Sequence, residues 1–229
     1  MLTITWKEIQ KNGFMFIAFI VLTIVMALMF NDYLPGIFDE EREMLATNYS
    51  MMLGIFVHMI IFSGLMANEK EEEQSHGYEF MRSLPIESWQ IVAGKYLAAI
   101  CYAIYAIVLI VGVTSIFGVK IESKLLPLAY TLFCAGVGLV LVGGLYLLAF
   151  KIRYTKLIPV VMIVYIIAMM SPQIIHLLLL INEKESTVEK LFSGLTMMTG
   201  GIIFAVGLIL FAGLGVLAVR VKDKIPVPN

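Results

Sequence analysis

Six stretches of this chain run for roughly the thickness of a lipid bilayer without Asp, Glu, Lys or Arg. A membrane-spanning helix needs about 20 predominantly apolar residues, and only helices or closed barrels satisfy their backbone polar groups in lipid. The stretches are continuously apolar rather than alternating, which favours helices over barrel strands. The sequence therefore predicts an all-α polytopic membrane protein with six transmembrane helices, at residues 13–30, 49–67, 96–119, 125–150, 157–181 and 201–219.

Composition agrees with this interpretation. Only 14% of the residues are charged and 60% are hydrophobic, whereas soluble domains have about 25% charged residues. The net charge of −1 gives no bulk electrostatic attraction to nucleic acid, so we expect no nucleic-acid partner. Cys101 and Cys134 lie in apolar runs and are interpreted as small packing residues.

Lys and Arg in the connecting segments predict the orientation, because cytoplasmic loops carry an excess of them. Both termini and the loop at residues 68–90 are expected in the cytoplasm. With that topology eleven basic residues lie inside, namely Lys7, Lys11, Lys70, Arg82, Lys95, Lys151, Arg153, Lys156, Arg220, Lys222 and Lys224. Five lie outside, namely Arg42, Lys120, Lys124, Lys184 and Lys190.

Two segments are expected at the membrane surface. Residues 1–12 place Leu2, Trp6 and Ile9 near one helical face with charged residues elsewhere, which is typical of an interfacial helix; the alternative is a frayed start of the first span. Residues 182–200 are predicted to form a short helix on the outer side, with a break before the sixth span at Gly200-Gly201.

Motifs for membrane chemistry are missing from the sequence. It contains no HExxH, GxSxG or P-loop. The histidines at positions 58, 76 and 176 are scattered and are interpreted as packing residues. The predicted spans hold no acidic group and no internal Lys or Arg, which argues against an ion-coupled transporter. If ATP drives this protein, another chain must bind it.

The loop at residues 68–90, hereafter the charged loop, is the densest polar region. Phe80, Met81 and Leu84 can share one helical face, and Glu79 and Arg82 can pair at i, i+3. This pattern predicts a short amphipathic helix, although an ordinary loop helix without a partner would show the same pattern.

The residues that follow predict how this short helix joins the third span. Pro85 disfavours helix at the residue before it. Ser88 can cap the next helix, which is expected to carry Lys95 at its surface.

This region resembles the signature of ABC-2 type transporter permeases, also called type V ABC exporters. The matching residues are Gly77, Glu79, Ser83, Leu84, Pro85, Ile86, Ile91, Val92, Gly94 and Lys95. The layout of the whole chain is similar too, as one transmembrane domain over residues 1–229. Small permeases of this kind serve bacitracin resistance and phenol-soluble-modulin export, so the resemblance implies a bacterial plasma membrane.

The resemblance also implies a coupling helix that docks on a separate ATP-binding cassette ATPase subunit. Its residues here, hereafter the coupling segment, are Gly77, Tyr78, Glu79, Phe80, Met81, Arg82, Ser83, Leu84 and Pro85. A second permease chain, identical or paralogous, is implied, together with export of an amphipathic peptide, lipid or drug between the two chains. No catalytic residue, metal or cofactor is expected in this chain, since ATP would bind the partner.

Two other functions stay open on the sequence, a membrane-embedded enzyme with an unrecognised site and a non-transporting scaffold or immunity protein. The glycines at positions 136, 138, 143 and 144 can line an interface with a second chain or pack helices within this one.

The predicted orientation can be tested by labelling single cysteines at Asp39 and Ser75 in a background that lacks Cys101 and Cys134. Asp39→Cys should react with an impermeant thiol reagent in intact cells, and Ser75→Cys only after lysis, because of the asymmetry in Lys and Arg. Labelling of Ser75→Cys in intact cells would contradict the orientation.

Overall fold

The computed structural model describes residues 2–30, 52–66, 69, 87–116, 125–152, 154–181 and 197–222. Every described element is a helix, in agreement with the all-α prediction. In chain order the helices are α1 (Leu2–Lys11), α2 (Gly13–Phe30), the helix Met52–Met66, α5 (Ser88–Ile116), α6 (Leu125–Ala149), α7 (Tyr154–Ile181) and α9 (Met197–Lys222).

Three of these helices, α5, α6 and α9, are each long and apolar enough to cross a membrane. The bent pair α1–α2 passes the same test as a fourth when it is taken together. Met52–Met66 and the stretch Lys156–Ala168 of α7 are apolar but shorter. The chain is thus a membrane protein, while the full set of six spans stays a prediction.

The predicted helix break at Gly200-Gly201 is wrong, because α9 runs unbroken from Met197 to Lys222. The glycine at position 200 serves close packing instead. A Cβ added there would lie 2.5 Å from the carbonyl oxygen of Ala129 on α6. Residues 182–196 of the predicted outer helix lie outside the described part of the chain.

The chain bends between α1 and α2, at the end of the segment predicted to be an interfacial helix; its position in the membrane surface stays a prediction. α1 and α2 meet at an angle of 57°. At the bend the N–H of Asn12 donates to the carbonyl of Ile9 at 3.1 Å, three residues back instead of four. The Asn12 side chain then donates to the carbonyl of Glu8, also at 3.1 Å. On its outer side α1 exposes Leu2 (73%) and Trp6 (60%).

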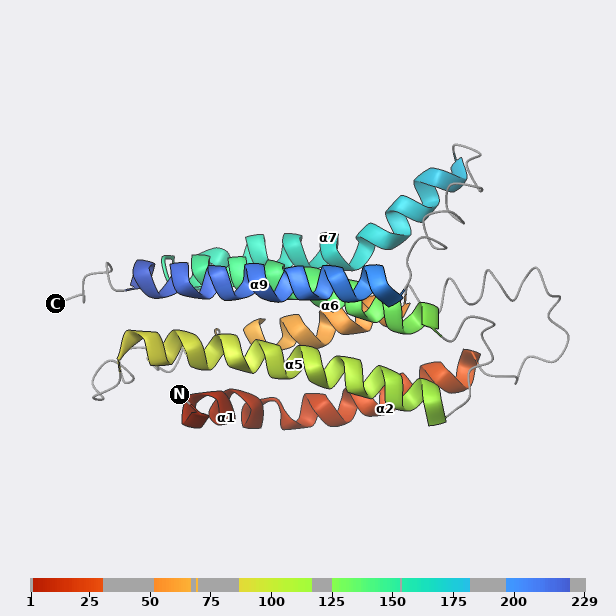
Figure 1. The fold of residues 1–229 in the computed structure, drawn as a ribbon, viewed down its shortest axis with the longest axis horizontal. Helices are drawn as coiled ribbons and strands as arrows, with labels where there is room; N and C mark the ends of the chain where they lie inside the picture. Colours follow the sequence, from red (N-terminus) through yellow and green to blue (C-terminus); the bar gives the residue numbers. More distant parts are fainter. Residues whose placement is uncertain are drawn as a thin grey trace, which may run out of the picture.

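Helix α5 lies at the centre of the arrangement, between α1 and α2 on one side and α6 and α9 on the other (Figure 1). Its tyrosines donate to backbone carbonyls of three neighbouring helices. Tyr96 donates to Gly143 on α6, Tyr102 to Glu8 on α1, and Tyr105 to Phe16 on α2, at distances of 2.7, 2.8 and 2.7 Å. Such bonds are directional, so they orient α5 relative to its neighbours where apolar contact alone would not.

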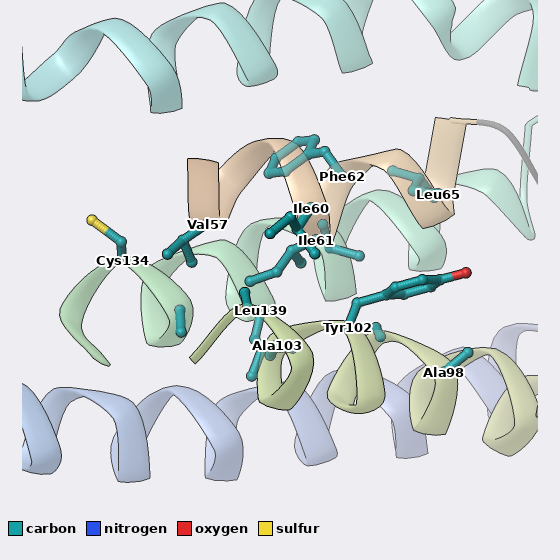
Figure 2. Packing of buried hydrophobic residues seen from close by; sticks show 14 of the residues in the cluster. Val57, Ile60, Ile61, Phe62, Leu65, Ala98, Tyr102, Ala103, Cys134 and Leu139 are labelled. Carbon is teal, nitrogen blue, oxygen red and sulfur yellow. The ribbon is translucent and has the colours of Figure 1, made fainter. Parts of the chain in front are cut away.

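The helix Met52–Met66 supplies much of the buried core. Figure 2 shows its apolar side chains with those of α5 and α6. The ring of Tyr102 lies so close to this helix that a Cβ at Gly64 would come within 2.3 Å of the ring Cε2 atom. Close approach therefore explains that glycine. Cys134 is buried here and Cys101 is partly buried, and neither forms a disulfide.

Helices α6 and α9 pack against each other more extensively than any other pair among α1, α2, α5, α6, α7 and α9. Their backbones approach closely where small residues meet. A Cβ at Gly207 would lie 2.6 Å from the carbonyl oxygen of Gly136. In lipid, apolar side chains gain little from being buried against each other, because lipid tails are equally apolar. Small residues are favoured at helix interfaces there because they allow dense backbone contact.

Three of the four glycines of α6 pack against helices of this same chain. Gly136 contacts α9, Gly138 lies against the helix Met52–Met66, and Gly143 faces Phe211 of α9. A Cβ at Gly144 would meet no atom within 4 Å.

The outward faces of the described helices are strongly apolar. Phe14 is 82% exposed, Ile116 78% and Ile209 71%. Further exposed branched or aromatic side chains follow along α2, α7 and α9. Soluble monomers rarely expose large apolar patches, and these faces suit a surface that contacts lipid or another membrane chain.

The packing of α6 on α9 predicts opposite effects for two alanine substitutions in α9. Gly207→Ala places a methyl group against backbone atoms, and such overpacking typically costs about 1–3 kcal/mol of stability. Gly213→Ala is the matched control, because a Cβ there meets nothing within 4 Å and alanine favours helix by about 1 kcal/mol over glycine. Thermal unfolding in detergent should show a lower transition temperature for Gly207→Ala only. Equal stability of the two variants would contradict the close contact.

Candidate functional site at the base of the charged loop

The coupling segment, residues 77–85, lies outside the described residues, so its role stays a prediction. The structure does describe both flanks of the charged loop. On one side stands Glu69, shortly after the helix Met52–Met66, and on the other side stands Glu87 at the start of α5. The geometry at this base determines how anything attached to the loop would act on the bundle.

α5 begins at Ser88, at the C-terminal end of the charged loop. The N–H of Gln90 donates to the carbonyl of Glu87 at 2.9 Å, and the Gln90 side chain accepts from the N–H of Glu87 at 3.3 Å. The Trp89 indole N–H also donates to the Glu87 carboxylate. Glu87 therefore occupies the cap position and Ser88, the predicted cap, is the first helical residue. From there α5 continues for 29 residues to Ile116.

The expectation that Lys95 lies at the surface is wrong, because its side chain is fully buried. The ammonium group pairs with the carboxylate of Glu69, and its Nζ lies 3.9 Å from Oε1 of Glu8. Both glutamates are fully buried as well. We call Glu8, Glu69 and Lys95 the ion cluster. The physical reason for the burial is this pairing, since an unpaired ammonium in an apolar interior would cost several kcal/mol.

An aromatic side chain of α6 completes the surroundings of the ammonium. Nζ of Lys95 lies 5.9 Å from the ring centroid of Tyr146, within the range of a cation–π interaction. The neighbouring Tyr96 holds α6 through its bond to Gly143. The ion cluster therefore contacts α6 in addition to the segments that carry its three charged groups.

Helix α1 is fastened to α5 along its polar face. The hydroxyl of Thr5 donates to the carbonyl of Gly94 at 3.2 Å. Asn12 donates to the Tyr102 hydroxyl at 2.7 Å, and that hydroxyl donates in turn to the carbonyl of Glu8. Sequence reasoning placed Glu8 on the polar side of α1 without a partner; the structure turns that side inward, onto α5.

No local pattern in the sequence predicts this cluster. Lys95 directly precedes the apolar run at residues 96–119, where a lysine can reach the membrane surface, and Glu8 lies among polar residues before the first apolar run. Glu69 resembles the first member of an acidic run, and nothing local separates it from the glutamates that follow. Its pairing with a lysine 26 positions later is visible only in three dimensions.

The described residues offer little else of chemical interest. They contain no group of three or more His, Cys, Asp or Glu side chains that could hold a metal ion. His58 is buried and its Nδ1 lies 2.8 Å from the carbonyl of Gly54, so it is a hydrogen-bonded packing residue as expected.

Comparison with known proteins adds a family to this description. The family model described as ABC-2 family transporter protein matches residues 5–219. No curated protein and no solved structure gives a significant match. The matched range includes the interfacial helix from Thr5, the charged loop, the ion cluster and all but the last residues of α9. With a match over nearly its whole length, the chain belongs to the ABC-2 family of transporter proteins.

Proposed function

We propose that this chain is the membrane-spanning permease subunit of an ATP-binding cassette exporter. The observation that carries the proposal is the family match over residues 5–219. It agrees with the resemblance of residues 77–95 to the permease signature. ATP binds and is hydrolysed on a separate subunit in this proposal, and the permease itself performs no catalysis.

The charged loop is the docking site for that ATPase. Its coupling segment presents an apolar face, formed by Phe80, Met81 and Leu84, beside the charges of Glu79 and Arg82. The contact between Glu69 and Lys95 supports this role. Because these two residues meet, the start of the charged loop and the start of α5 are held together at one place. A force on the loop therefore acts on a single point of the bundle, at the start of α5.

The exporter contains a second permease chain, identical or paralogous, and moves an amphipathic substrate between the two. The apolar outward faces of the described helices support both points, because they can contact lipid, a second permease and an amphipathic peptide, lipid or drug. The membrane is the bacterial plasma membrane, with both termini in the cytoplasm. In Figure 1 the start of α1 and the end of α9 lie at the same end of the bundle, as this topology requires.

Substitutions in the coupling segment should weaken binding to the ATPase without disturbing the fold. Phe80→Ala and Leu84→Ala each remove an apolar anchor, which typically costs about 1–4 kcal/mol at an interface. That corresponds to roughly a tenfold to thousandfold loss of affinity. Glu79→Arg reverses a charge expected to face basic groups of the partner. The measurements are co-purification with the ATPase and substrate-stimulated ATP hydrolysis in nanodiscs.

Combined neutralisation of Glu71 and Glu72 is the control, because we interpret these residues as a solvated run whose charges contribute little. If the variants at Glu79 and Phe80 bind and stimulate the ATPase normally while the Glu71/Glu72 variant fails, the coupling segment has been misplaced. A wild-type chain that neither binds nor stimulates an ATPase would instead favour the enzyme or scaffold alternatives.

A further inference from the structure

Three segments that are distant in the sequence are joined by charge at one buried point. Glu8 belongs to α1, Glu69 starts the charged loop, and Lys95 lies in α5. We propose that this ion cluster is the joint that transmits movement of the charged loop to the transmembrane helices. The inference rests on the proposed function, in which the loop carries the ATPase, and assigns Glu8, Glu69 and Lys95 as positioning residues for coupling.

Stability alone does not explain an ionic cluster at this place. A buried ion pair loses much of its Coulomb energy to desolvation, and apolar residues of similar volume often stabilise a core equally well. The neighbourhood is already rich in apolar side chains, with Ile91, Val92, Ala98 and Ala99 of α5 all buried. What an ion pair adds is a defined geometry between its partners, because breaking or displacing it leaves a charge unpaired in an apolar environment.

The connections of the cluster define the path of transmission. Lys95 lies about two turns into α5, counted from Ser88 at 3.6 residues per turn, so the pair ties the start of the loop to a continuous helix. Thr5 and Asn12 fasten α1 to the same helix through Gly94 and Tyr102. The Lys95 ammonium also contacts the ring of Tyr146, which belongs to α6. A displacement of the loop therefore moves α1, α5 and α6 together.

The test separates a structural role from a transmitting one by removing all three charges at once. The variant Glu8→Gln/Glu69→Met/Lys95→Met keeps the side-chain volumes approximately and leaves no unpaired charge. We expect it to fold, insert and bind the ATPase like the wild type, while substrate-stimulated ATP hydrolysis falls on the order of tenfold, a typical size for a coupling effect. Lys7→Met is the control, because Lys7 is the exposed neighbour of Glu8 on α1 and its replacement should leave stimulation unchanged.

A charge exchange provides the second arm. Glu69→Lys and Lys95→Glu each place like charges together and should each abolish stimulation. The double variant Glu69→Lys/Lys95→Glu restores opposite charges at the two positions and should recover part of it, which gives a double-mutant cycle for the pair. If the neutral variant does not fold, this recovery decides: recovered stimulation supports the joint, and its absence overturns it.

The outcomes distinguish this inference from the proposed function. Wild-type chain that fails to bind and stimulate the ATPase contradicts the proposed function and removes the inference with it. If the folded neutral variant shows the same substrate-stimulated ATP hydrolysis as the wild type, the inference about the ion cluster is wrong. The proposed function is then unaffected. Loss of ATPase binding in the neutral variant also overturns the joint, since it would place these residues in docking rather than in transmission.

Discussion

The burial of a single ammonium group determines much of the arrangement at one end of this bundle. Lys95 lies in a helix that is apolar for most of its length, so its charge must be met by groups from other segments. Glu69 and Glu8 meet it, and to do so α1 must lie along α5 and the chain after the helix Met52–Met66 must return to α5. α1 turns its polar face onto α5 through Thr5, and it meets α2 at an angle of 57°.

Two different kinds of packing hold the bundle together, and α5 lies where they meet. Toward α1 and α2 polar contacts add to apolar ones. The tyrosine hydroxyls of α5 bond to carbonyls with the ion cluster beside them, and Phe16 of α2 packs against the rings of Tyr102 and Tyr105. Between α6 and α9 the contacts are made by glycines that bring backbone against backbone. In lipid both are effective for the same reason, since neither depends on expelling water from apolar surface. The polar contacts fix direction and register, and the glycine contacts provide dense packing without polar groups.

The helical class follows from the sequence, and three of the six predicted spans correspond closely to α5, α6 and α9. Both predictions depend on hydropathy over long windows. Predictions that depended on one residue were less successful. Gly200 suggested a helix break, yet its role is to admit the Ala129 carbonyl, and a glycine alone does not distinguish the two. Lys95 was expected at the surface because a lysine at the end of an apolar run usually is. Its burial depends on Glu8 and Glu69, whose proximity no local pattern encodes.

The proposed role of the ion cluster also explains why buried charges lie at the base of the charged loop. A loop that merely crosses from one span to the next needs no buried charge at its base, since solvent satisfies its polar groups. A loop that moves the spans needs a firm attachment, because flexible residues between it and the helix would absorb the movement. In the proposed mechanism the attachment is made by Glu69, near the start of the charged loop, and by Lys95, after its end, and it acts on a helix of 29 residues. Such a helix is about 43 Å long at about 1.5 Å per residue, so in the proposed mechanism a rotation at its start is carried along its whole length without a break in the backbone.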